Sequence, residues 1–179
     1  AGCDFPWRVA KTPDGNEAYV SCENSDSVVA INLTSRTVMQ QVAGIYRADG
    51  VAFSRDGTYA FIGSRSGGSN AINRINTQTY AVSSIYYGSA TRSIAVHPYL
   101  DLAYITDSAG AILVLDTSVF GIVDTIPVSA EPWDVAVSPD GRWVFTGDRS
   151  SGVITVIDTT TNAIHTTIGG LGTVTGLSV

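Results

Sequence analysis

Arginine, aspartate and tryptophan recur in this sequence beside the ends of repeated apolar segments. They are Trp7, Arg8, Arg47, Asp49, Arg92, Asp107, Trp133, Asp134 and Arg149. Guanidinium groups bind anions, and the face of an indole ring attracts cations and polar ligands. These residue types predict a pocket for an anionic or carbohydrate-like ligand, with Arg8, Arg47 and Arg92 as its binding groups. Trp7 and Trp133 would flank that ligand.

The same residues also have a structural interpretation. Tryptophan packs well between neighbouring structural units, and arginine forms ion pairs with aspartate on an adjacent unit. Such contacts would stabilise a stack of repeated units without binding any ligand. The sequence alone leaves both interpretations open.

We expect no cofactor and no metal site. The two histidines, His97 and His165, have no second His, Cys or carboxylate at metal-ligand spacing. The sequence also lacks a heme-attachment motif, a phosphate-binding loop, a nucleophile elbow and an EF-hand loop. The set of candidate catalytic groups is therefore small.

Charge and composition narrow the range of partners. Lys and Arg number only 10 and the net charge is −6, so the chain offers no basic field for nucleic acid. No apolar run approaches the roughly 20 residues of a membrane-spanning helix. Hydrophobic residues make up 44% and charged residues 15%, which favours a well-buried β protein.

Cys3 and Cys22 are the two cysteines of the chain. Cys3 precedes the first predicted strand and Cys22 ends the second, so an antiparallel hairpin would bring them to the same end. A disulfide there would fit an oxidising compartment, and two unpaired thiols are the alternative. Richness in Ser, Thr, Asn and Gly with few Lys is also typical of extracellular, cell-surface or periplasmic proteins.

Four copies of one pattern run along the chain and must position all of these residues. They are VAKTPDGNEAYVS from Val9, VAFSRDGTYAFIG from Val51, IAVHPYLDLAYIT from Ile94 and VAVSPDGRWVFTG from Val135. The copies start 42, 43 and 41 residues apart. A repeat of this length indicates an architecture built from similar units.

Each unit predicts four short strands, as the fourth copy shows. Residues 134–138, 143–147, 153–158 and 163–168 are rich in apolar or β-branched residues. Pro139-Asp140-Gly141 separates the first two, because Pro fixes φ, Asp bonds its own backbone and Gly accepts a positive φ. Four strands joined by tight turns form one antiparallel sheet.

Such a sheet has two apolar faces and must stack on copies of itself around an axis, which is the all-β architecture of the β-propeller. The residues of the fourth unit, from Pro132 to Gly141 and from Val153 to Thr159, resemble the YVTN repeat family of propellers. The segments Ala18-Tyr-Val-Ser21 and Ala103-Tyr-Ile-Thr-Asp107 resemble it too. This resemblance implies a fold shared by surface-layer proteins, lactonases and amine dehydrogenase subunits, and it implies no one activity.

The predicted blades span about residues 6–47, 48–91, 92–131 and 132–173, and residues 174–179 would begin a fifth. Because both ends of the chain supply an innermost strand, three explanations stay open. The chain is a fragment of a longer propeller, two chains complete one ring, or the blades stack openly into a polymer. We therefore expect self-association, or a protein partner, at blade faces and strand edges.

Two functions from different classes fit these features. The first is a non-enzymatic module for surface scaffolding, self-assembly or protein binding, with ligand binding on its loop face. The second is a part of a lactonase-like hydrolase or of a periplasmic dehydrogenase subunit. That enzyme would need a metal or cofactor near Asp49, Arg92 and Asp134.

Overall fold

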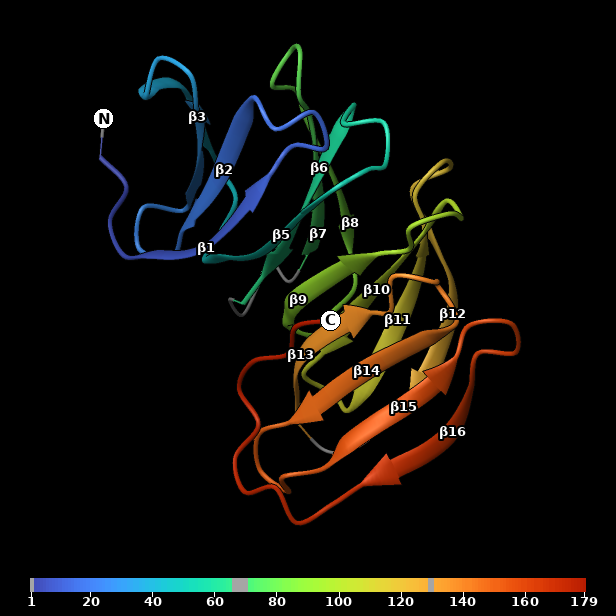
Figure 1. The fold of residues 1–179 in the computed structure, drawn as a ribbon. Helices are drawn as coiled ribbons and strands as arrows, with labels where there is room; N and C mark the ends of the chain where they lie inside the picture. Colours follow the sequence, from blue (N-terminus) through green and yellow to red (C-terminus); the bar gives the residue numbers. More distant parts are fainter. Residues whose placement is uncertain (1, 66–70, 129–130) are drawn as a thin grey trace. The chain divides into compact units, whose positions relative to one another are not determined.

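The computed structural model describes residues 2–65, 71–128 and 131–179, and it confirms an all-β fold of four-stranded antiparallel blades (Figure 1). Blade 1 comprises β1 (Pro6–Lys11), β2 (Glu17–Cys22), β3 (Ser27–Asn32) and β4 (Thr37–Ala43). Blade 2 comprises β5 (Ala48–Phe53), β6 (Tyr59–Ser64), β7 (Ala71–Asn76) and β8 (Val82–Tyr86). Blade 3 comprises β9 (Thr91–Val96), β10 (Leu102–Asp107), β11 (Ala111–Asp116) and β12 (Gly121–Pro127). Blade 4 comprises β13 (Pro132–Val137), β14 (Trp143–Asp148), β15 (Ile154–Asp158) and β16 (Ala163–Ile168).

Within each blade the strands follow one another in chain order. Residues 66–70 of the second predicted blade and residues 129–130 of the third lie outside the described residues. In the described part of the chain, no helix is long and apolar enough to cross a membrane.

The turns after β1, β5 and β13 share one hydrogen-bonded design. In blade 2 the Ser54 hydroxyl donates to Asp56 Oδ1 over 2.6 Å and accepts from the Tyr59 amide over 2.9 Å. Gly57 follows with a φ of +73°, which an L side chain rarely adopts. Asp14 and Asp140 accept the corresponding bonds from Thr12 and Ser138. These bonds are local, which is why the turns could be predicted from sequence.

The lowered pKa values of the turn aspartates lead us to expect that the folded protein is less stable in acid. Hydrogen bonds, first from the Ser54 hydroxyl and then from Thr58, lower the pKa of Asp56 from 3.8 to about 2. The hydroxyls of Thr12 and Ser138 likewise lower the pKa values of Asp14 and Asp140. A carboxyl group whose pKa is lower in the folded state stabilises the fold at pH values above its unfolded-state pKa. That stability is lost as the pH falls through its folded-state pKa.

Urea unfolding midpoints should therefore fall as the pH drops from about 4 to about 2. The triple variant Asp14→Asn, Asp56→Asn, Asp140→Asn should be less stable at neutral pH and show a flatter profile. A wild-type midpoint that stays constant through this window would contradict the role given to the turns.

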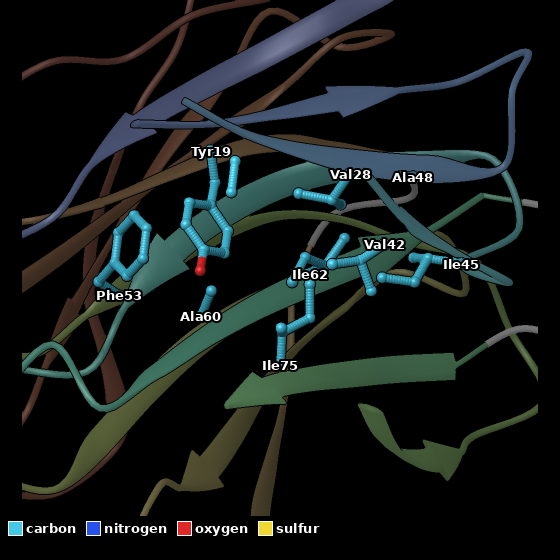
Figure 2. Packing of buried hydrophobic residues seen from close by; sticks show 10 residues of the cluster. Tyr19, Val28, Val42, Ile45, Ala48, Phe53, Ala60, Ile62 and Ile75 are labelled. Carbon is cyan, nitrogen blue, oxygen red and sulfur yellow. The ribbon is translucent and has the colours of Figure 1, made fainter. Parts of the chain in front are cut away.

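The strands divide into two compact units, Ala1–Thr91 and Arg92–Val179. In the first, called unit 1 below, one face of blade 1 packs on blade 2 around a core of wholly or nearly buried side chains (Figure 2). This core comprises Tyr19, Val28, Ala30, Val42, Ile45, Ala48, Phe53, Ala60, Ile62 and Ile75. The rings of Tyr19 and Phe53 meet edge to face, with centroids 5.0 Å apart. Burial of this apolar surface is the main force that holds the two sheets together.

The second unit, unit 2, packs blade 3 on blade 4 through side chains at the same repeat positions. Its core comprises Tyr104, Ile112, Val114, Ile126, Val135, Val144 and Ile157. Tyr104 takes the place of Tyr19, and Ile157 takes the place of Ile75. Residues at equivalent repeat positions therefore form the blade-to-blade contact in both units.

His97 replaces the hydroxyl and aspartate of the usual turn in blade 3. Its Nδ1 accepts hydrogen bonds from the amides of Tyr99 and Leu100, at 3.0 and 2.9 Å. Nε2 must then carry the proton, and it donates to the Gly141 carbonyl over 2.9 Å. His97 therefore anchors the turn of blade 3 to blade 4, so its role is structural.

The prediction that residues 174–179 begin a fifth blade stays a prediction. Residues 169–179 contain no strand. An inner strand forms by pairing with the second strand of its own blade, and the described residues offer none to this segment. Instead, Val174 packs against Gly147, where an added Cβ would lie 2.3 Å from the valine, and the Leu177 amide donates to Asp134 Oδ2 over 2.9 Å.

Candidate functional site

The structure distributes the predicted site residues between the two units. Unit 1 holds Trp7, Arg8, Arg47 and Asp49, and unit 2 holds Arg92, Asp107, Trp133, Asp134 and Arg149. Within each unit, several of these side chains meet at the end of the blades where the first strands begin and the second strands end. The contacts of each group decide what it can do chemically.

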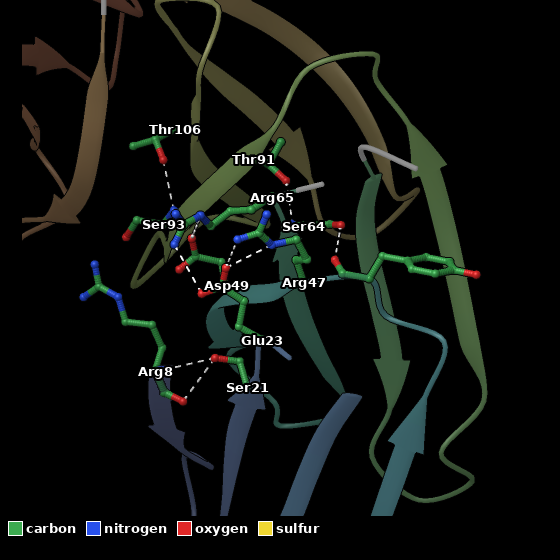
Figure 3. A network of polar contacts seen from close by, with 11 residues as sticks. Arg8, Ser21, Glu23, Arg47, Asp49, Ser64, Arg65, Thr91, Ser93 and Thr106 are labelled. Carbon is green, nitrogen blue, oxygen red and sulfur yellow. Dashed lines mark hydrogen bonds and ion pairs between the residues drawn. The ribbon is translucent and has the colours of Figure 1, made fainter. Parts of the chain in front are cut away.

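In unit 1, Glu23 is the centre of a charged network (Figure 3). It follows β2 and is only 4% exposed. Arg47 forms a close ion pair with Glu23 Oε1, and its Nε donates to the same oxygen over 3.0 Å. Arg65 places Nη1 3.5 Å from Glu23 Oε2 and Nε 3.4 Å from Asp49 Oδ2. The network joins blade 1, through Glu23, to blade 2, through Asp49 and Arg65.

Trp7 and Arg8 lie at the start of β1, beside this network. The guanidinium of Arg65 lies 5.4 Å from the centre of the Trp7 ring, and Phe5 stacks on the same indole with centroids 5.7 Å apart. Arg8 is held by its backbone, since its amide donates to the Ser21 hydroxyl over 3.0 Å. The indole therefore already interacts with a cation of its own chain.

The unit 1 network favours the structural interpretation of Arg47 and Asp49. Each buried carboxylate in it faces a guanidinium, so the charges satisfy one another across the blade contact. Glu23 and Arg65, which hold the network together, were not included in the predicted site. Glu23, Arg65 and Arg149 each stand two residues after the end of the repeated 13-residue segment of their own blade. This shared repeat position is the sequence signal that could have identified Glu23 and Arg65 as site residues.

In unit 2, Trp133 is the centre of the second group. It is 9% exposed, and the guanidinium groups of Arg92 and Arg149 lie 4.1 and 4.3 Å from its ring centre. Asp134 accepts a close hydrogen bond from the Ser93 hydroxyl and a second from the Leu177 amide. This carboxylate thus links blade 4 both to blade 3 and to the C-terminal segment.

Asp107 serves as a turn residue. Its Oδ1 accepts the Ala109 amide over 3.0 Å and its carbonyl accepts the Gly110 amide over the same distance. Such an Asx turn orders the loop after β10. Within the described ranges, no three His, Cys, Asp or Glu residues gather in a way that could hold a metal ion.

A disulfide joins Cys3 to Cys22, with Cα atoms 5.2 Å apart. The sequence had left this pairing open. Further bonds hold the N-terminal segment along blade 1, because the Asp4 amide donates to Ser25 Oγ over 2.7 Å and Gln41 Nε2 donates to the Gly2 carbonyl over 3.2 Å. The disulfide fixes one wall of the groove described next.

Blade 1 has an outward apolar face, opposite to the face that packs on blade 2. Its register places Val9, Val20 and Val29 in one row and Ile31 beside Val38 in another. A groove of about 190 Å³ crosses this face. Its lining consists of Cys3, Pro6, Val20, Val29, Ile31, Val38 and Gln41.

The outward face of blade 1 corresponds to a face that is buried elsewhere in unit 1. Val20 and Ile31 stand at the repeat positions of Ile62 and Ile75, which are both 0% exposed because blade 1 covers them. Val20 and Ile31 are only partly buried, and Val9 on the same face is 67% exposed. Blade 1 therefore presents to solvent the side on which a preceding blade would pack. Contiguous exposed apolar faces are uncommon on monomeric soluble proteins.

No protein-family model matches the sequence, and no curated protein matches it. Among solved structures, hydrazine synthase of Kuenenia stuttgartiensis is similar, with a TM-score of 0.88 and 20% sequence identity. The match covers 96% of this chain and 51% of that chain, so this chain spans about half the length of the structure that it matches. At this identity the similarity shows the blade fold alone.

Proposed function

We propose that this chain is a non-enzymatic β-propeller module that assembles with further copies of itself through its blade faces. The observation that carries this proposal is the outward apolar face of blade 1. It has the register and residue types of the blade 2 face that packs on blade 1. The surface that would pack on it resembles the face of blade 1 that contacts blade 2, which includes Tyr19, Val28 and Ala30.

Blade 4 of a second copy offers such a surface. On the side of blade 4 that faces away from blade 3, Phe145 stands at the repeat position of Tyr19, and Ile154 stands at that of Val28. Ile168 pairs with Ile154 on this side and is 48% exposed. Lys11 stands on blade 1 where Phe53 stands on blade 2, so its ammonium group could lie over the Phe145 ring.

The C-terminal segment competes for this contact. Leu177 corresponds to Val9 in the repeat, and Val174 already packs against Gly147 on the same side of blade 4. A second copy would have to displace the segment in order to place its β1 there. Because the two joining faces differ, the contact is head to tail, and it produces a ring if it closes and a filament if it does not.

We also propose that the chain is a YVTN-type repeat protein that functions outside the cytoplasm, as an extracellular, cell-surface or periplasmic module. The repeated Pro-Asp-Gly turns and Val-rich strands support the first part. The Cys3–Cys22 disulfide supports the second, since such bonds persist mainly in oxidising compartments.

The test is the mass of the chain in solution. By light scattering, the wild type should exceed its chain mass of 18.8 kDa by an amount that grows with concentration. Val9→Glu should return the mass to that of the monomer, because a carboxylate would be buried at the contact without a partner. The matched control Val119→Glu, at a turn residue that is 74% exposed, should associate like the wild type.

Two results would contradict the proposal. One is a wild type that stays monomeric at all concentrations, and the other is a Val9→Glu variant that associates like the wild type. A monomer that retained stoichiometric calcium, zinc or magnesium after dialysis would instead favour the enzymatic alternative. Release of the competing segment by Val174→Asp should strengthen association, whereas Val179→Asp should leave it unchanged.

A further inference from the structure

A pocket of about 420 Å³ opens in unit 1 where three turns meet. The β1–β2 turn contributes Thr12 and Asp14, the β5–β6 turn contributes Asp56, and Tyr80 comes from the turn before β8. Glu17 at the start of β2 and Met39 on β4 also line it. Among the described residues that line the pocket, none carries a positive charge. The pocket therefore combines three carboxyl groups with an aromatic and a thioether wall.

Asp14 and Asp56 supply fixed negative charge. Asp14 accepts bonds from the Thr12 hydroxyl at 2.6 Å and from the Asn16 side chain at 2.7 Å. Asp56 accepts from Ser54 and Thr58 in the same way, with both hydroxyl contacts at 2.6 Å. These bonds lower the pKa of each carboxyl group, so both stay ionised at neutral pH. Their oxygens are already engaged by the turns.

Glu17 differs from the two aspartates. Its Oε2 is buried and makes no hydrogen bond within the described residues. Burial, and then the charge of Asp14, raise the pKa of this carboxyl group. An acceptor that is shielded from water and unpaired is destabilising unless a donor reaches it. Glu17 Oε2 can therefore accept a hydrogen bond from a donor inside the pocket, and a positively charged donor would also attract the carboxylate.

A second unpaired group lies next to Glu17. Tyr19 is 0% exposed, and its hydroxyl makes no hydrogen bond within the described residues. The side chains of Tyr19 and Glu17 lie on the same side of β2, since they are two residues apart in one strand. Burial raises the pKa of Tyr19, and so do the nearby charges of Glu17 and Tyr80, two residues of the pocket lining. The hydroxyl therefore lies near Glu17 and Tyr80, in the core beside the pocket.

We propose that this pocket binds an alkylammonium group. A primary ammonium is a donor, so it can donate to Glu17 Oε2, while the charges of Asp14 and Asp56 stabilise its own charge. Tyr80 and Met39 provide walls for the alkyl stem, and the Tyr80 ring can also attract the cation. An anion would meet three carboxyl groups and no cation. The ammonium comes either from a free small amine or from a lysine side chain of a polypeptide.

The test compares two probes by titration calorimetry on the whole chain: n-butylamine, and a short neutral peptide with one central lysine. Saturable binding of either probe is expected, and n-butanol, which has the same stem without the charge, should not bind. Tighter binding of the peptide would assign the ligand to a polypeptide, and equal or tighter binding of the amine would assign it to a free amine.

Glu17→Gln should weaken binding at least about tenfold, since one charge-assisted hydrogen bond is lost. Glu131→Gln, an acidic residue of unit 2 outside the pocket, is the matched control and should bind like the wild type. Absence of saturable binding by both probes, or a folded Glu17→Gln variant that binds as tightly as the wild type, would overturn the proposal.

Discussion

Ile75→Ala should lower the free energy of unfolding of unit 1 by about 2–5 kcal/mol, as expected for a buried isoleucine whose removal leaves a cavity. Ile75 is 0% exposed and packs between blades 1 and 2. Ile31→Ala removes the same atoms from the same repeat position, but on the outward face of blade 1. It should cost about 1 kcal/mol or less, because solvent already reaches this residue.

The comparison requires urea unfolding followed by circular dichroism on dilute protein, so that self-association does not bury Ile31. Ile157→Ala, at the equivalent buried position of unit 2, should behave like Ile75→Ala. If Ile31→Ala proved as destabilising as Ile75→Ala in the monomer, the outward face of blade 1 would have to be covered within a single chain, contrary to our account.

Loss of the Cys3–Cys22 disulfide should have the second largest effect, about 3 kcal/mol of stability for a closed loop of this length. The bond spans 19 residues of sequence and fixes the N-terminal segment along blade 1. Its absence would enlarge the ensemble of unfolded conformations and release one wall of the groove. We expect the double variant Cys3→Ala, Cys22→Ala to show a clearly lower melting temperature.

A reducing agent provides the control for this prediction. It should lower the melting temperature of the wild type to about that of the double variant, and it should leave the double variant unchanged. Equal melting temperatures for the oxidised wild type and the double variant would show that the bond contributes nothing to stability. The N-terminal segment would then be held by its hydrogen bonds alone.

The blades and their turns were predictable from the sequence because the interactions that form them are local. The Ser54–Asp56 bond and the positive φ of Gly57 lie within a single turn, and the repeat shows the same residues again around Asp140. The C-terminal segment was not predictable in this way. Whether residues 174–179 pair as a strand depends on a partner strand, and the repeat pattern of the segment cannot supply one.

The sequence placed the predicted site residues near the ends of the strands, and the structure brings several of them together there. The chemistry of these side chains depends on contacts between blades, which the sequence does not show. Arg47 and Asp49 are joined through Glu23 and Arg65, which come from different repeats. The pocket around Glu17 could not be predicted at all. Its burial arises when the turns of blade 2 pack beside β2, and no spacing in the sequence reports that contact.

Cross-linking between copies tests the central claim most directly. Val38→Cys places a thiol on the outward face of blade 1, and Ile168→Cys places one on the outward side of blade 4; the original residues are 61% and 48% exposed. When the two variants are mixed with a short bis-maleimide, we predict covalent dimers that contain one chain of each kind. Dimers formed only between identical chains, or no dimers at concentrations where the wild type associates, would contradict head-to-tail assembly through these faces.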